Sequence, residues 1–278
     1  MLTFRLWRAF KRPPTRNPLF RRAYTHPEEP APWYVGCVRW AGILVFLPII
    51  ALAGLIYGFG WSVGIAGLLG CERENRTFDL LALTPPGPLG MSWAAALGYL
   101  LHHRTFRNVN QTGNLLVRAA FMALILSGAG LVLTVAVIFG APPFVLLILY
   151  TVTLFVALVV DQAQSLVAAV LAGIIAADAA GSRLGAQLYA FSLYAGVQLV
   201  TYVLTFALGF TLFPSFADAT GRSDLPATLA VVGFRLVLFA GSRELLIWLL
   251  WRRVDNALCP DPYEQRLLLG LPTRKVRP

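Results

Sequence analysis

The amino-acid sequence predicts an all-α fold: a polytopic bundle of about six transmembrane helices with additional interfacial helices. Of the 278 residues, 58% are hydrophobic and only 13% are charged, whereas soluble domains have about 25% charged residues. Several uncharged blocks reach the length of about 20 residues that a membrane-spanning helix needs. The formal net charge of +10 gathers near the ends of these blocks, which favours membrane orientation over nucleic-acid binding.

The apolar blocks and the charged segments between them divide the chain into five regions. We expect a basic cytosolic N-terminal segment at 1–39, a first membrane block at 40–70, a cytosolic coupling and interfacial region at 71–114, a transmembrane bundle at 115–251, and a cytosolic tail at 252–278. Cytosolic termini require an even number of crossings.

The N-terminal segment alternates aromatic and basic residues. The two series are Phe4, Trp7 and Phe10 against Arg5, Arg8 and Lys11. This spacing predicts a basic amphipathic helix that suits an anionic membrane surface. Pro13 and Pro14 end it. An Arg-rich transit peptide is the alternative interpretation of the same segment.

The first membrane block, 40–70, contains no charged residue and is long for one span but short for two. Pro48 and several glycines would allow a kink or a tight re-entrant hairpin. A single crossing would put the following charged run on the opposite side from the N-terminus. Two crossings, or a dip and return, would put it on the same side.

The charged run that follows, 71–86, predicts a short amphipathic helix at the cytosolic membrane surface. Glu72 and Arg76 are four residues apart, with the acid first, which favours an ion pair on one helical turn. Phe78 and Leu81 begin an apolar patch after the charges. Pro85 ends the helix near Leu83. A juxtamembrane charge cluster followed by an interfacial turn is the simpler interpretation.

The letters of this run, ERENRTFDLLALTP, resemble the signature E-x-E-R-x-T-x-(D/E)-L-L-x-L-T-P of the type-2 permeases of ATP-binding-cassette transporters. In that family the segment couples the permease to the ATP-binding subunit. The resemblance implies a coupling role for Glu72, Arg73, Glu74, Arg76, Thr77, Asp79, Leu81 and Thr84. The segment 17–24, NPLFRRAY, is similar to the lead-in of these permeases, with Ala23 where an acidic residue is expected.

The same resemblance implies the partners and the location of the protein. It implies an ATP-binding subunit that binds ATP and magnesium, and a second permease copy or a related permease. It also implies a multi-pass location in the plasma membrane, here the prokaryotic inner membrane, and transport in the export direction. The chain itself contains no phosphate-binding loop, so we expect it to bind no cofactor.

The later apolar segments supply the remaining expected helices. The segment 89–101 is short and is expected to be interfacial, and the candidate spans are 115–139, 144–160, 163–180, 185–213 and 228–251. Small residues four apart in 163–180 would let helix backbones approach closely. We favour six true spans, a cytosolic charged run, and one segment beside Asp161 that does not cross independently.

Polar residues within the apolar segments are the candidates for a transport pathway, because ionisable groups are costly in a bilayer. The candidates are Asp161, Gln164, Tyr194, Gln198, Thr201 and Arg235. Hydrogen bonding between helices is the alternative role of the stripe on 194–205. Arg235 is expected to reach outward or to pair within the bundle. Arg243 and Glu244 are expected near the inner surface in a structural role.

The sequence indicates neither a catalytic nor a metal site. Its three cysteines are scattered, and its three histidines form no ligand set. The alternatives to a permease are a membrane scaffold or assembly protein that transports nothing, and a membrane-embedded enzyme that uses Asp161 and a histidine.

Overall fold

The computed structural model describes residues 2–10, 20, 21, 24, 46–78, 87–103, 106, 141–212 and 225–258. Their regular structure is entirely helical, which confirms the all-α fold class for this part of the chain. The helices are α1 (Leu2–Phe10), α4 (Phe46–Glu74), α6 (Gly87–His102), α8 (Ala141–Ala179), α9 (Arg183–Phe206), the π-helix η1 (Ala207–Leu212) and α11 (Leu225–Leu258). The expected span 115–139 and the tail after Leu258 lie outside the described residues.

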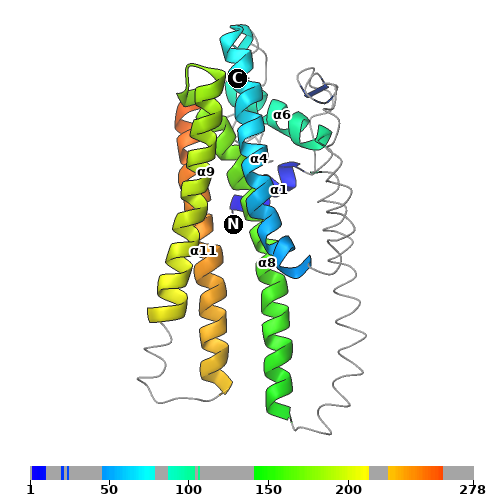
Figure 1. Ribbon diagram of the computed structural model, residues 1–278, viewed down its shortest axis with the longest axis vertical. Helices are drawn as coiled ribbons and strands as arrows, with labels where there is room; N and C mark the ends of the chain where they lie inside the picture. Colours follow the sequence, from blue (N-terminus) through cyan, green and yellow to red (C-terminus); the bar gives the residue numbers. More distant parts are fainter. Residues whose placement is uncertain are drawn as a thin grey trace, which may run out of the picture.

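Four long helices form the bundle, with α4, α8, α9 and α11 packed side by side (Figure 1). The charged end of α4, the α8–α9 corner and the last turn of α11 lie at one end of the bundle. We call this the motif end. The opposite end contains the start of α8, η1 and the start of α11. The short helices α1 and α6 pack against the bundle, where α1 contacts α8 and α11.

Helix α4 corrects the expectation for the first membrane block. From Phe46 to Glu74 the chain is one continuous helix, so no hairpin exists in this range. Two of its glycines instead leave room for side chains of neighbouring helices. A Cβ atom at Gly58 would come within 2.0 Å of the Tyr194 hydroxyl oxygen, and one at Gly64 would come equally close to that of Tyr99. The missing side chains therefore let α9 and α6 lie close against α4.

Helix α8 joins two segments that the sequence suggested as separate spans. Residues 144–160 and 163–179 belong to one helix of 39 residues, and Asp161 lies in its interior rather than in a connection. The expectation that one of the two segments does not cross a membrane independently stays a prediction. The small residues of 163–180 do allow close packing. A Cβ at Gly173 would lie 2.9 Å from the carbonyl oxygen of Ser62 on α4.

The N-terminal helix forms as expected, but it buries a different face. Thr3, Leu6 and Phe10 are buried, whereas Phe4 is 49% exposed. An α-helix has 3.6 residues per turn. Positions 3, 6 and 10 therefore lie closer to one face of the helix than positions 4, 7 and 10, which repeat strictly every three residues. Phe10 stacks on Trp93 of α6. Helix α6 is itself mostly buried by protein, and its expected interfacial or partly inserted position stays a prediction.

Two helical segments within the described residues are long and apolar enough to cross a membrane, Val159–Ala179 and Arg183–Gly209. The first is mostly enclosed by other helices, while the second exposes most of its apolar surface. On α11, the large side chains of Phe234, Val237 and Trp248 are likewise exposed. Extended exposed apolar surfaces mark sites of contact with lipid or with another protein.

Candidate functional site

A buried ion pair joins α8 and α11 in the interior of the bundle. The side chain of Arg243 has no exposed surface, and its Nη1 donates to Oδ1 of Asp161. The same nitrogen lies 3.3 Å from the carbonyl oxygen of Asp161. Nη2 donates to Oε1 of Gln198 on α9. One guanidinium group therefore connects three helices.

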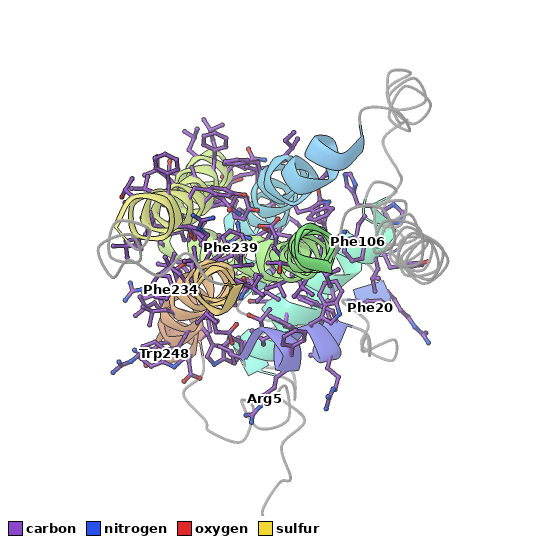
Figure 2. The ribbon with its side chains drawn as sticks, turned by 90° about the horizontal axis from the view of Figure 1, so that it is seen from below. Arg5, Phe20, Phe106, Phe234, Phe239 and Trp248 are labelled. Atoms are coloured by element: carbon purple, nitrogen blue, oxygen red, sulfur yellow. The ribbon has the colours of Figure 1, made fainter. Side chains whose placement is uncertain are left out.

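Aromatic rings enclose the guanidinium group of Arg243. Its central carbon lies 5.1 Å from the ring centre of Phe239 and 5.7 Å from that of Tyr202. Figure 2 shows Phe239 directed into the bundle and Trp248 directed outward from the same helix. Cation–π contacts of this kind gain strength where water is excluded. The rings and the Asp161 carboxylate together compensate the arginine charge.

Further polar residues extend this site along α8 and α9. Nε2 of Gln164 donates to the carbonyl oxygen of Ala240 at 3.0 Å, and Nε2 of Gln198 lies 3.5 Å from Oγ of Ser165. We call the set the buried polar centre: Asp161, Gln164, Ser165, Tyr194, Gln198, Thr201 and Arg243. All seven residues are buried. The bonds of Gln164 and Gln198 join separate helices.

The buried polar centre contains five of the six residues expected to line a pathway. Asp161, Gln164, Tyr194, Gln198 and Thr201 all belong to it. In this conformation their side chains face one another or the backbone of the bundle, and hydrogen bonds between helices are the role that the structure gives to Gln164 and Gln198. The hydroxyl of Thr201 instead donates to Val197 within α9 at 2.8 Å.

Arg235, the sixth candidate, lies apart from the centre. Its Nε donates to the carbonyl oxygen of Gly209 at 2.9 Å, within the π-helix η1. The arginine therefore pairs with a polar group inside the bundle, one of the two roles expected from the sequence. Single π-helical turns are often found at functional sites.

Arg243 is the residue that the sequence interpretation missed. The sequence interpretation gave it only a structural role near the inner surface; the structure shows that it is fully buried and pairs with Asp161. The signal that could have found it is its place in a long apolar segment, 225–251, where a charge needs a partner. Its partner lies 82 positions earlier in the chain, beyond the range of any local pattern.

A second group of contacts ties the coupling motif to the α8–α9 corner. Nη2 of Arg73 lies 2.7 Å from Oδ1 of Asp178, and Nη1 donates to the carbonyl oxygen of Asp178 at 3.1 Å. Glu74 accepts a hydrogen bond from the backbone N–H of Arg183 at the start of α9. We call these four residues, Arg73, Glu74, Asp178 and Arg183, the motif contact.

The local structure of the motif differs from the expected surface helix. Glu72 and Glu74 belong to the last turn of α4, and Arg76 has a φ of 55°, the left-handed conformation that often ends a helix. Glu72 and Arg76 therefore do not share one helical turn. The hydroxyl of Thr77 donates to the Glu72 carbonyl at 2.9 Å and also to its carboxylate. Asp79, Leu81 and Thr84 lie outside the described residues.

The described residues contain no cluster of three or more side chains that could hold a metal ion. Fold and site together define an all-helical bundle with apolar outer surfaces, a charged pair buried between three helices, and an acidic and basic motif at one end. No known family model, curated protein or solved structure matches this chain. Its function is therefore argued from its own residues.

Proposed function

We propose that this chain is the transmembrane permease subunit of an ATP-binding-cassette transporter of the type-2, exporter class, driven by a separate ATP-binding subunit. It would be a multi-pass protein of the plasma membrane with about six crossings, and α4, α8, α9 and α11 would supply four of them. A second permease copy or a related permease would complete the pathway. ATP and magnesium would bind to the partner subunit.

The observation that carries this proposal is the motif contact. A coupling segment must pass the movement of the ATP-binding subunit on to the spanning helices. Arg73 and Glu74 are the last two residues of α4, and they also bond to the end of α8 and the start of α9. A displacement of this motif would therefore act on three long helices at once.

The charges at the motif end support a cytosolic position for it. Basic residues gather there on three helices and at their ends: Arg73, Arg76, Arg183, Arg252 and Arg253. Cytosolic segments that flank membrane spans carry an excess of arginine and lysine. This orientation would place the motif on the side of the membrane where ATP is present.

The proposed mechanism follows from how the two sites are linked. Closure of the ATP-binding subunits would push on the segment 72–78 and tilt α4 together with the α8–α9 corner. The buried polar centre joins α8, α9 and α11, so a movement of the α8–α9 corner would also act on α11. Small shifts of packed helices are a known way of switching access between two sides. The polar residues of the centre would meet cargo only when the helices separate.

The test is co-purification with the ATP-binding subunit, followed by ATP hydrolysis in vesicles. The variant Glu72→Arg with Glu74→Arg should lose stimulation of ATP hydrolysis while the chain keeps its elution profile. Arg252→Gln, at the same end but outside the motif, is the matched control. Retention of full stimulation by the charge-reversed variant would contradict the coupling role.

Co-purification and one further variant distinguish the alternative functions. A membrane scaffold that transports nothing would co-purify with no ATP-binding subunit. An enzyme that uses Asp161 would lose its reaction in Asp161→Asn when the chain is purified alone. The partner that the structure gives to the Asp161 carboxylate is an arginine, which suits a structural or switching role better than proton transfer.

A further inference from the structure

We propose that α1 is a latch: it holds α11 in the position in which Arg243 pairs with Asp161, and its release opens the buried polar centre. The inference rests on the contacts of α1 and α11. It holds whether or not an ATP-binding subunit acts on the motif end.

The first point of attachment is the pair of Thr3 and Glu244. The backbone N–H of Thr3 donates to Oε1 of Glu244 at 3.2 Å, and its hydroxyl donates to Oε2. Both carboxylate oxygens are thus held by a single residue of α1. Thr3 is only 1% exposed and Glu244 is half-buried, so these bonds are partly shielded from competing water. Hydrogen bonds to a charged group are about twice as strong as neutral ones.

The second point of attachment is aromatic. It runs from α1 through Trp93 of α6 to α11, two turns after Glu244. Phe10 stacks on Trp93 with ring centres 5.0 Å apart, and Trp93 meets Trp251 edge to face at 6.3 Å. Trp251 follows Glu244 by seven residues, which places both on the same side of the helix. The two attachments together resist both rotation and sliding of α11 at this level.

The latch acts on the polar centre because Glu244 directly follows Arg243. Successive side chains on a helix point about 100° apart. Glu244 therefore contacts α1 while Arg243 points into the bundle toward α8 and α9. A rotation of α11 that carries Arg243 away from Asp161 would also break the bonds to Thr3. The two contacts are consequently formed or lost together.

The exposed and buried residues of α1 show that its apolar face packs against the rest of the protein. Arg5 and Arg8 are exposed while Leu6 is buried against the bundle, and Figure 2 shows Arg5 directed away from it. The position of α1 is therefore set by contacts with α6, α8 and α11.

The test measures access to the buried polar centre in the full chain. Ser165→Cys, in a background in which Cys37, Cys71 and Cys259 are replaced by serine, reports access through its rate of labelling by a small methanethiosulfonate. Thr3→Val and Glu244→Gln should each raise this rate about tenfold, as loss of a hydrogen bond to a charged group predicts. Arg5→Gln, on the exposed side of the same helix, should leave the rate unchanged.

A second reporter separates a latch from a general loss of stability. Ala66→Cys lies in the α4–α8–α9 packing and is as fully buried as Ser165. A latch raises labelling at 165 alone, whereas global loosening raises it at both sites. Equal increases at both reporters, or no increase at 165 in either variant, would overturn the proposal. The measurement uses no ATP-binding subunit, so its failure would leave the permease proposal standing.

Discussion

Arg243 and Asp161 form an ion pair across 82 positions of the chain, in the interior between α11 and α8. Burying a charged side chain costs on the order of several kcal/mol unless the charge is paired and its remaining polar atoms form hydrogen bonds. Here Gln198 and the ring of Phe239 contact the guanidinium group, while Nε of Arg243 is buried without a hydrogen-bond partner among the described residues. The pair therefore selects how three helices pack.

Removing one member of this pair should destabilise the protein far more than removing both. Arg243→Leu leaves the Asp161 carboxylate buried without its partner, and we expect a loss of about 3–5 kcal/mol. Asp161→Leu combined with Arg243→Leu should cost clearly less than either single change. Thermal unfolding of the purified chain in detergent measures both. Additive losses in the double variant would contradict the pairing.

A methyl group at Gly58 should disturb the contact between α4 and α9. The added carbon would overlap the ring and hydroxyl of Tyr194, so Gly58→Ala should cost about 1–3 kcal/mol, as overpacking does. Gly60 is the matched control, because a Cβ there meets open space. Gly60→Ala should be neutral or slightly stabilising, since alanine favours a helix over glycine by about 0.5–1 kcal/mol. Unfolding temperatures compare the two.

Replacement of Arg235 tests the π-helical turn at the end of α9. Arg235→Leu removes the donor to the Gly209 carbonyl, and a buried acceptor without a partner costs about 1–3 kcal/mol. Hydrogen exchange of the amides of 207–212 should increase in this variant, while that of 183–200 stays slow. If exchange in 207–212 does not change, the arginine does not support this turn.

The pair at the motif end should matter little for stability. Arg73 and Asp178 are 27% and 30% exposed, so solvent weakens their attraction to about 0.2–1 kcal/mol. Asp178→Asn should therefore lower the unfolding temperature only slightly. If the motif contact transmits movement, the same variant should still reduce stimulation of ATP hydrolysis in the assembled transporter. A large loss of stability with unchanged stimulation would assign the pair to folding alone.

The native Cys71 provides a test of orientation. It is half-buried at the motif end, next to the charged residues of α4. With Cys37 and Cys259 replaced by serine, a membrane-impermeant maleimide should label it in inside-out vesicles and not in intact cells. Labelling from outside intact cells would put the motif on the wrong side for an ATP-binding subunit.

Local patterns in the sequence predicted most of the helical segments within the described residues. The long apolar segments became α4, α8, α9 and α11, and the amphipathic N-terminus became α1. In the polar stripe on 194–205, Tyr194, Gln198 and Thr201 are buried, as expected for residues that face the bundle, whereas Thr205 is half-buried. Each of these features depends on neighbouring residues, which is why composition and periodicity could reveal them.

Other features could not be predicted because they depend on partners far away in the chain. Glycines in α4 would allow a hairpin, but Tyr194 and Tyr99 fill the space beside Gly58 and Gly64 and the helix stays continuous. The buried face of α1 includes Thr3 because Glu244 offers an acceptor there. Neither contact can be predicted from the periodicity of hydrophobic residues along the chain.

The sequence by itself determined that this chain forms long apolar helices, where charges interrupt them, and which polar residues a bundle has to accommodate. Only the tertiary structure decided that Arg243 is the partner of Asp161 and that Glu244 holds α1. The physical reason is that hydropathy and periodicity act over one or two helical turns. The choice of partner for a buried charge depends instead on which helices lie side by side once the chain has packed.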